Sequence, residues 1–418
     1  ILTVSGGSFL SNVAPYGGAV ENMGSALLEN VVFSGNFASS GGAVCNYGGS
    51  VYDEATSSTT YIGGTTTVAG GTFSANSATT GGAAANGWGL LNVSNAVFSA
   101  NSATGGGAVA NADSLSIAGG TFSGNSATSG GAILNSQWAS ATLLSGVFAE
   151  NAATSQGGAV WNGGALEISG ATFSLNETSR GGAACNAASG TLTVSGAAFY
   201  GNSASYWGGA VYNEGTATIE GGTFSTNVAS YRGGAIYNGG TATIVGGAQF
   251  SQNVANASGG ALCNASGASA TVTGGAFTEN SATYQGGAIC NEGELQIFDA
   301  TFEGNSAGYA GGAIYNMNSA AISGAVFSGN SATYGGGAVV NYGAATITDA
   351  DFVGNRTTSQ GGAILNSSGD LTVVGGTYSM NSAGSGGAIF NNGTASIAGG
   401  TFSGNSASRG NGGAIFNS

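Results

Sequence analysis

The chain has 418 residues, of which 82 are glycine, one is proline and none is histidine, and only 5% are charged. Its four cationic residues are all arginines and stand against 18 acidic residues, a formal net charge of −14, so a run of phosphates could not be neutralised and nucleic-acid binding is excluded. With 42% hydrophobic residues the chain is too apolar to be disordered, no segment is apolar for long enough to span a membrane, and four cysteines are too few for a disulfide framework.

Two short motifs recur along the whole chain. A Phe-x-x-Asn element is present in sixteen copies, from Phe9 to Phe402, with Tyr378 replacing phenylalanine once. Each copy is followed by Gly-Gly-Ala, a small or aliphatic residue, a variable residue and asparagine, from Gly17–Asn22 to Gly412–Asn417. The copies lie 24 to 27 residues apart except for one gap of 40, and a period of this length is typical of a solenoid.

The long gap falls between Phe33 and Phe73 and places an insertion at 47–60, after the third strand of the second repeat. A tolerated surface insertion is the commoner explanation for such a segment. The alternative is a binding loop formed by its acidic and aromatic residues Tyr52, Asp53, Glu54 and Tyr61.

Each repeat is predicted to form three short strands separated by turns. In 216–224 the residues Ala217 and Ile219 share one face while Thr218 and Glu220 share the other, which is the alternation of a β-strand. The second strand is Phe-Ser-x-Asn and the third is Gly-Gly-Ala-Ile-x-Asn, followed by turns rich in Asn-Gly. This pattern predicts an all-β, right-handed parallel β-helix of about 16 coils of about 25 residues, as a single domain over 1–418 with the insertion at 47–60.

Parity along the strands predicts two inward ladders of asparagine. If Ile236 of the third strand points inward, then Asn238 does too, and each asparagine stacks on its equivalent in the next coil. Buried amides need hydrogen-bond partners, and identical neighbours supply them. The predicted structural ladders include, in the Phe-x-x-Asn element, Asn202, Asn227, Asn253 and Asn280 and, in the third strand, Asn213, Asn238, Asn264 and Asn291.

Two cysteines occupy the same outward position of successive third strands, Cys263 and Cys290. Stacked equivalents lie close enough for a disulfide, but parallel neighbours in register are awkward for its dihedral angle. The pair is therefore predicted to be either a disulfide or two adjacent thiols, with Cys45 and Cys185 free.

The residue types needed for catalysis are largely missing. Without histidine no Ser/His or Cys/His pair exists, and the arginines before Gly-Gly-Ala are expected to be solvated turn residues. The carboxylates Asp349 and Asp351, and an acidic patch from Glu292 to Glu303, are the weak candidates for catalysis or calcium binding. We therefore expect no enzyme activity and no cofactor, and a polysaccharide-active enzyme is only a remote alternative.

The variable position of the third strand is expected to point outward and to form a flat apolar stripe. This candidate self-association stripe consists of Leu134, Trp161, Tyr212, Tyr237, Tyr315, Val340, Leu365, Phe390 and Phe416. The first residues, Ile1–Val4, and the last motif, Gly412–Asn417, match interior repeats, so neither end is expected to carry a cap. Both features predict association with copies of the chain, end to end and laterally.

The paired motifs, such as Phe302–Asn305 with Gly311–Ile314, resemble the repeats of the polymorphic outer membrane proteins of chlamydiae, and more loosely those of other bacterial surface proteins. The resemblance covers essentially the whole chain. It implies a secreted, surface-exposed β-helical passenger that acts in adhesion and is exported as an autotransporter.

Together these observations predict a non-enzymatic extracellular or cell-surface structural protein, a self-assembling surface fibre or filament subunit. The alternative is an adhesin passenger domain that binds host or neighbouring cells. The two differ in whether the purified chain polymerises or stays monomeric and binds a receptor.

Overall fold

The computed structural model describes residues 1–53 and 57–418, and the chain divides into two compact units. Unit 1 comprises Ile1–Ser203 and Glu214–Thr216, and unit 2 comprises Ala204–Asn213 and Ala217–Ser418. Both units consist of strands and turns, and the described residues contain no helix.

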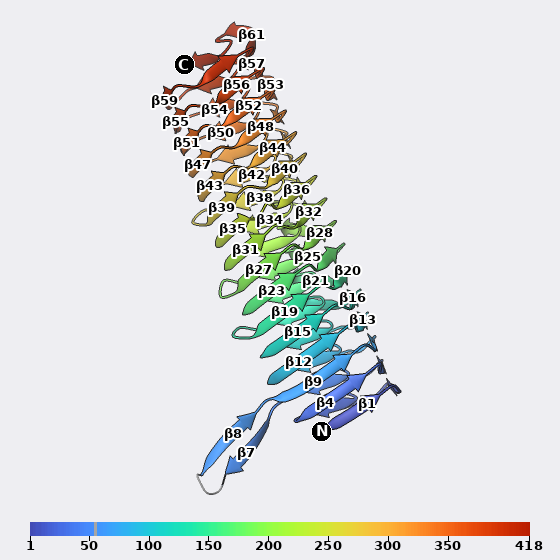
Figure 1. Cartoon of the computed structure of the whole chain (residues 1–418). Coiled ribbons are helices and arrows are strands. Elements are labelled where there is room, and N and C mark those ends of the chain that lie inside the picture. The colour runs from blue at the N-terminus through green and yellow to red at the C-terminus, as the bar shows by residue number, and fades with distance from the viewer. Residues whose placement is uncertain (54–56) are drawn as a thin grey trace. The chain divides into compact units, whose positions relative to one another are not determined.

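Each unit is a stack of coils in which a strand pairs in parallel with the equivalent strand of the next coil (Figure 1). In unit 1, β19 (Ser140–Leu144) pairs with β23 (Ala165–Ser169) so that Leu143 lies opposite Ile168. In unit 2, β38 (Leu262–Asn264) pairs with β42 (Ile289–Asn291) so that Asn264 lies opposite Asn291. The predicted all-β parallel solenoid, with about 16 coils and three strands in each, is confirmed.

Unit 1 contains three parallel sheets and part of a fourth. The first sheet has the order β1 (Leu2–Ser5), β4 (Ser25–Glu29), β9 (Gly64–Ala69), β12 (Gly89–Ser94), β15 (Ser114–Ala118), β19, β23 and β27 (Thr191–Ser195). The second has the order β2 (Ser8–Leu10), β5 (Val32–Ser34), β10 (Thr72–Ser74), β13 (Val97–Ser99), β16 (Thr121–Ser123), β20 (Val147–Ala149), β24 (Thr172–Ser174) and β28 (Ala198–Tyr200). The third has the order β3 (Val20–Asn22), β6 (Val44–Asn46), β11 (Ala84–Asn86), β14 (Val109–Asn111), β18 (Ile133–Asn135), β22 (Val160–Asn162) and β26 (Ala184–Asn186). The fourth contains β17 (Ser126–Ser129), β21 (Ala152–Gln156) and β25 (Glu177–Arg180).

Unit 2 repeats this arrangement. Its first sheet has the order β31 (Thr216–Glu220), β35 (Thr241–Val245), β39 (Ser269–Thr273), β43 (Glu294–Phe298), β47 (Ser319–Ser323), β51 (Ala344–Thr348), β55 (Asp370–Val374) and β59 (Thr394–Ala398). Its second has the order β32 (Thr223–Ser225), β36 (Gln249–Ser251), β40 (Ala276–Thr278), β44 (Thr301–Glu303), β48 (Val326–Ser328), β52 (Asp351–Val353), β56 (Thr377–Ser379) and β60 (Thr401–Ser403). Its third has the order β30 (Val211–Asn213), β34 (Ile236–Asn238), β38, β42, β46 (Ile314–Asn316), β50 (Val339–Asn341), β54 (Ile364–Asn366), β58 (Ile389–Asn391) and β62 (Ile415–Asn417). Its fourth contains β29 (Ser203–Trp207), β33 (Val228–Ala229), β37 (Val254–Ala255), β41 (Ser281–Ala282), β45 (Ser306–Ala307), β49 (Ser331–Ala332), β53 (Arg356–Thr357), β57 (Ser382–Ser385) and β61 (Ser406–Asn411).

The fourth sheet was not predicted from the sequence. Its strands lie between the Phe-x-x-Asn element and Gly-Gly-Ala, and several of them have only two residues. Such pieces are too short to show the two-residue alternation by which a strand is recognised in a sequence.

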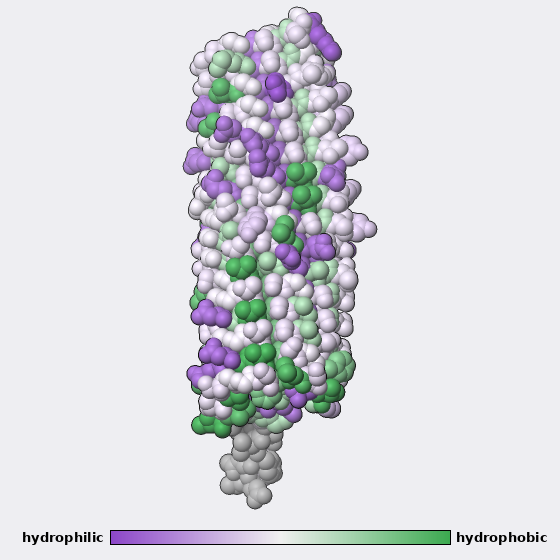
Figure 2. All heavy atoms as spheres, turned by 90° about the vertical axis from the view of Figure 1, so that its right-hand side faces the viewer, coloured by the Kyte–Doolittle hydropathy of each residue, from purple (hydrophilic) through white to green (hydrophobic). Residues whose placement is uncertain are grey.

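The core of each unit is built from columns of identical side chains. Phenylalanines of the second sheet stack from coil to coil, with ring centroids 4.7 Å apart for Phe98–Phe122 in unit 1 and 4.8 Å apart for Phe277–Phe302 in unit 2. Aliphatic residues of the first and third sheets complete the interior, and Ile168 and Ile289 are fully buried. On the face drawn in Figure 2 most residues lie near the middle of the hydropathy scale, with a smaller number of strongly hydrophobic and strongly hydrophilic residues among them.

Three bends close each coil, and each has a residue with positive φ. The first follows the first sheet and is Gly-Gly in half of the coils, while residues such as Asn95, Asp299 and Asp349 occupy it in others. The second is the residue before the asparagine of Phe-x-x-Asn, and the third is the first glycine of Gly-Gly-Ala. Glycine, asparagine and aspartate tolerate this conformation best, which explains their recurrence at the first and third bends, whereas the second bend also holds larger residues such as Glu150 and Leu175.

The insertion of unit 1 forms an antiparallel ribbon of β7 (Gly49–Asp53) and β8 (Ser58–Ile62), in place of the loop that the sequence predicts (Figure 1). Of the residues suggested for a binding loop, Glu54 lies outside the described residues, as do the side chains of Tyr52, Asp53 and Tyr61. The binding role of the insertion stays a prediction.

Candidate binding surface

The asparagines predicted to form ladders are hydrogen-bonded from coil to coil. In the third sheet of unit 2, Asn238 Nδ2 donates to Asn264 Oδ1 at 2.8 Å and to the carbonyls of Ser269 and Gly240 at 2.9 and 3.1 Å. In the Phe-x-x-Asn ladder, Asn305 Oδ1 accepts from both the backbone N–H and the Nδ2 of Asn280, each at 3.0 Å. These amides are buried and bonded to one another, so they stabilise the stack and are not available to a ligand.

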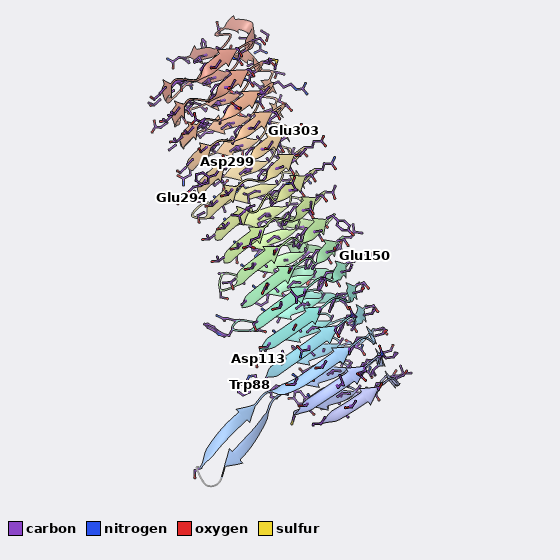
Figure 3. The ribbon with its side chains drawn as sticks, in the orientation of Figure 1. Trp88, Asp113, Glu150, Glu294, Asp299 and Glu303 are labelled. Atoms are coloured by element: carbon purple, nitrogen blue, oxygen red, sulfur yellow. The ribbon has the colours of Figure 1, made fainter. Side chains whose placement is uncertain are left out.

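The acidic residues singled out in the sequence lie on different strands and bends. Glu294, Asp299 and Glu303 lie at separate points of one coil, on β43, on the following bend and on β44 (Figure 3). Asp349 occupies the same positive-φ bend as Asp299, and Asp351 Oδ1 accepts a hydrogen bond from the Thr377 N–H at 3.1 Å. Among residues 1–53 and 57–418, no group of three acidic, cysteine or histidine side chains could hold a metal ion. Both aspartates thus have structural roles.

The expected outward stripe of the third sheet is not an open face, and this prediction was wrong. Of its nine residues, Tyr212, Tyr315, Val340, Leu365 and Phe390 are buried, and Leu134, Trp161, Tyr237 and Phe416 are half-buried.

The chain reverses direction at Gly-Gly, and this reversal covers the stripe. The residue just before Gly-Gly is thereby brought against the variable position of the third strand. Gln156 Oε1, for example, accepts a hydrogen bond from Trp161 Nε1 at 3.0 Å, and the ring of Trp207 stacks 5.5 Å from Tyr237. Ala310 packs in the same way into a cluster with Cys290 and Tyr315.

The paired cysteines Cys263 and Cys290 lie in this covered layer. They are opposite each other in register, fully buried and both free, so the structure has two adjacent thiols in place of a disulfide. Their mutual hydrogen bond and their burial raise the pKa of Cys263 well above its ordinary value. Cys45 and Cys185 are also free and buried.

A column of exposed tyrosines runs along unit 2, at the position two residues before Gly-Gly in five of its coils. It consists of Tyr206, Tyr231, Tyr284, Tyr309 and Tyr334, which are between 41% and 59% exposed. From Tyr231 onward, the backbone N–H of each tyrosine donates to the carbonyl of the residue at the same position in the preceding coil, as Tyr334 does to Tyr309 at 2.7 Å. The rings of Tyr309 and Tyr334, which are adjacent in the column, stack with their centroids 5.0 Å apart.

Ala257 interrupts this column. It occupies the tyrosine position of its coil, since its N–H donates to the Tyr231 carbonyl at 2.8 Å and its own carbonyl accepts from the Tyr284 N–H at 2.9 Å. The missing ring leaves an open hollow of about 550 Å³, lined by Tyr231, Arg232, Ala257, Ser258, Tyr284, Gln285 and Tyr309.

Arg232 at the edge of this hollow is not the solvated turn residue expected from the sequence. Its Nη1 lies 2.9 Å from the Glu292 carboxylate, and its guanidinium carbon lies 5.2 Å from the centroid of the Tyr231 ring. The arginine is therefore neutralised and held in place, and it presents a fixed polar edge beside an aromatic ring.

Six stretches of the chain match the model of the Chlamydia polymorphic membrane protein repeat, at residues 30–47, 119–136, 196–214, 274–292, 299–317 and 324–342. The chain carries polymorphic membrane protein repeats. The stretch 299–317 contains both motifs on which the resemblance was predicted, Phe302–Asn305 and Gly311–Ile314, so the resemblance is confirmed. No curated protein and no solved structure matches the chain.

The hollow lies where the polymorphic membrane protein repeats are less typical. Tyr206, Tyr284, Tyr309 and Tyr334 lie inside matched repeats, whereas Tyr231 and Ala257 fall between them. Sequence reasoning missed the column, although aligning the residues two places before Gly-Gly would have revealed it. In the described part of the chain no helix is long and apolar enough to cross a membrane.

Proposed function

We propose that this chain is a non-catalytic, cell-surface β-solenoid passenger that attaches to host or neighbouring cells. The observation that carries the proposal is the set of six polymorphic membrane protein repeats on a parallel solenoid, because that repeat is typical of surface-associated proteins and not of enzymes. The exposed tyrosine column supports attachment, since tyrosine combines a large apolar area with a polar tip and is enriched at recognition surfaces.

The sequence favoured lateral assembly into a fibre through the stripe of the third sheet. The structure gives this assembly less support, because the stripe is covered. Attachment and assembly are separated by two measurements on the purified chain. Fluorescent beads coated with it are expected to bind to epithelial or bacterial cells, and analytical ultracentrifugation is expected to show a monomer.

Beads coated with a chain of similar acidity but without exposed tyrosines provide the control for charge. Fibres in electron micrographs, together with no attachment to cells, would contradict the proposal and favour a filament subunit. Turnover of an acidic polysaccharide that is lost in Asp349→Asn would contradict the non-catalytic assignment.

A further inference from the structure

We propose that the hollow at Ala257 is a binding site for a neutral oligosaccharide, with one sugar ring seated where the tyrosine column lacks a side chain. The inference deepens the proposed function, on which its biological meaning rests. The first observation is the interruption of the tyrosine column at Ala257. The backbone of Ala257 continues the column without a break, while its small side chain leaves the hollow open.

The hollow has the size and lining of a small-molecule site. Its volume of about 550 Å³ falls within the range of roughly 300–1,000 Å³ that is common for ligand pockets. Tyr231, Tyr284 and Tyr309 line it, and their aromatic rings offer apolar surface against which the C–H groups of a sugar can pack.

The polar groups of the lining suit hydroxyl groups. Gln285 supplies an amide that both donates and accepts hydrogen bonds, Ser258 supplies a hydroxyl, and Arg232 supplies guanidinium N–H donors. A purely apolar ligand would leave these groups unpaired, which disfavours a lipid or an aliphatic side chain.

Charge selects a neutral ligand over an anionic one. Arg232 is the only cationic side chain that lines the hollow among the described residues, and Glu292 already neutralises it at 2.9 Å. The chain as a whole carries a formal charge of −14, which repels acidic glycans and nucleic acids.

The column beyond the hollow extends the site to an oligomer. Tyr309 and Tyr334 stack with their ring centroids 5.0 Å apart, a distance close to the length of one pyranose unit, so further sugars can contact the exposed edges of successive tyrosines. A longer oligosaccharide should therefore bind more tightly than a single sugar.

The test is isothermal titration calorimetry with the intact chain and three neutral probes: cellohexaose, mannohexaose and the fully N-acetylated chitohexaose. At least one should bind, and its monosaccharide should bind at least tenfold more weakly. Ala257→Tyr restores the column and fills the hollow without a new backbone conformation, because its neighbours in the column are tyrosines, and it should abolish binding. Tyr231→Ala should weaken binding by about tenfold, and Tyr200→Ala, which removes an exposed tyrosine of unit 1, should leave it unchanged.

The proposal is overturned if none of the three probes binds, or if Ala257→Tyr binds as well as the original chain while both have the same circular dichroism spectrum. It is also overturned if an acidic probe, a hexamer of galacturonate, binds better than every neutral one. Attachment of coated beads to cells that survives Ala257→Tyr would overturn the sugar site as the means of attachment and leave the proposed function standing. Sugar binding by a chain whose coated beads attach to no cells would leave the sugar site standing and overturn the proposed function.

Discussion

Tyr378 places a hydroxyl group where the other coils have only a phenylalanine ring. It stacks between Phe352 and Phe402 at 5.0 and 4.7 Å, and its side chain is fully buried. Its Oη has no hydrogen-bond partner among the described residues, and burial, with a contribution from Asp351, raises the pKa of its phenol. The Tyr378 hydroxyl thus carries a desolvation cost that the phenylalanines at the same position of the other coils do not have.

We expect Tyr378→Phe to stabilise the chain by about 1–3 kcal/mol, the cost of a buried unsatisfied polar group. Urea unfolding followed by circular dichroism measures the change. Tyr200→Phe is the matched control, because Tyr200 is exposed and should give a difference near zero. Equal stability of Tyr378→Phe and the original chain would show that the hydroxyl finds a partner in solution.

At the level of strands and bends, each coil is held by its asparagine ladders and by Gly-Gly. The first glycine of Gly-Gly-Ala needs positive φ, as at Gly130, where φ is 64°. The second, such as Gly131, is required for a different reason, because a Cβ there would overlap the carbonyl oxygen of Gly158 in the next coil. The first glycine is therefore required by the bend, and the second by the close packing of neighbouring coils.

Asn238→Leu should lower the free energy of unfolding by about 1–3 kcal/mol for each hydrogen-bonding group that loses its partner. The change removes the bond that Asn213 Nδ2 donates to Asn238 Oδ1 at 2.8 Å, and the bond that Asn264 Oδ1 accepts. Thr218→Ser, on the outer face of β31, is the control and should cost far less. Equal shifts of the thermal midpoint in both variants would contradict a stabilising role for the ladder.

Gly124→Ala and Gly131→Ala separate the two demands on glycine. Gly124 has a φ of 60° and open space around its missing Cβ, so alanine there should cost only the left-handed conformation, about 1–2 kcal/mol. Gly131→Ala should cost clearly more, because the clash is with backbone. Urea midpoints in the reverse order would show that conformation, and not the contact between coils, dominates.

At the scale of the molecule, the titratable groups buried among the described residues are thiols and phenols held in their neutral form. Burial raises the pKa of the Cys185 thiol from 9.0 to about 12, with Glu214 adding to the shift and Arg180 opposing it. Burial likewise raises the pKa of Cys45, and burial with neighbouring groups raises that of Tyr315. Such groups favour the folded state only while they remain protonated.

The chain should therefore lose stability at alkaline pH. Because the folded pKa of Cys185 lies above its unfolded value, its contribution is complete below about pH 9 and is lost as the pH rises toward about 12. Urea midpoints measured between pH 8 and pH 10.5 should fall, and the fall should be shallower in Cys185→Ala. An identical slope in the variant would show that this thiol ionises equally in both states.

The repeat by itself predicted most of the fold. The spacing of Phe-x-x-Asn and Gly-Gly-Ala determines the length of a coil, and parity along each strand correctly placed Ile236 and Asn238 inside, because neighbouring residues of a strand face opposite sides. The free state of Cys263 and Cys290 was left open, since register alone permits both a thiol pair and a disulfide.

The alternation of residues along a strand shows which side chains point outward, but it does not show which other segments of the chain pack against them. The stripe that includes Tyr315 and Phe390 is covered because the chain reverses at Gly-Gly and packs the preceding residue against it. The hollow at Ala257 likewise exists only because side chains from successive coils surround one missing ring. The cover is formed largely by residues only five apart, as Gln156 and Trp161 are, whereas the hollow is formed by residues of successive coils. Both escape the linear pattern for one physical reason: periodicity records only the side to which each residue points, and not which side chains the following turn or the next coil packs against it.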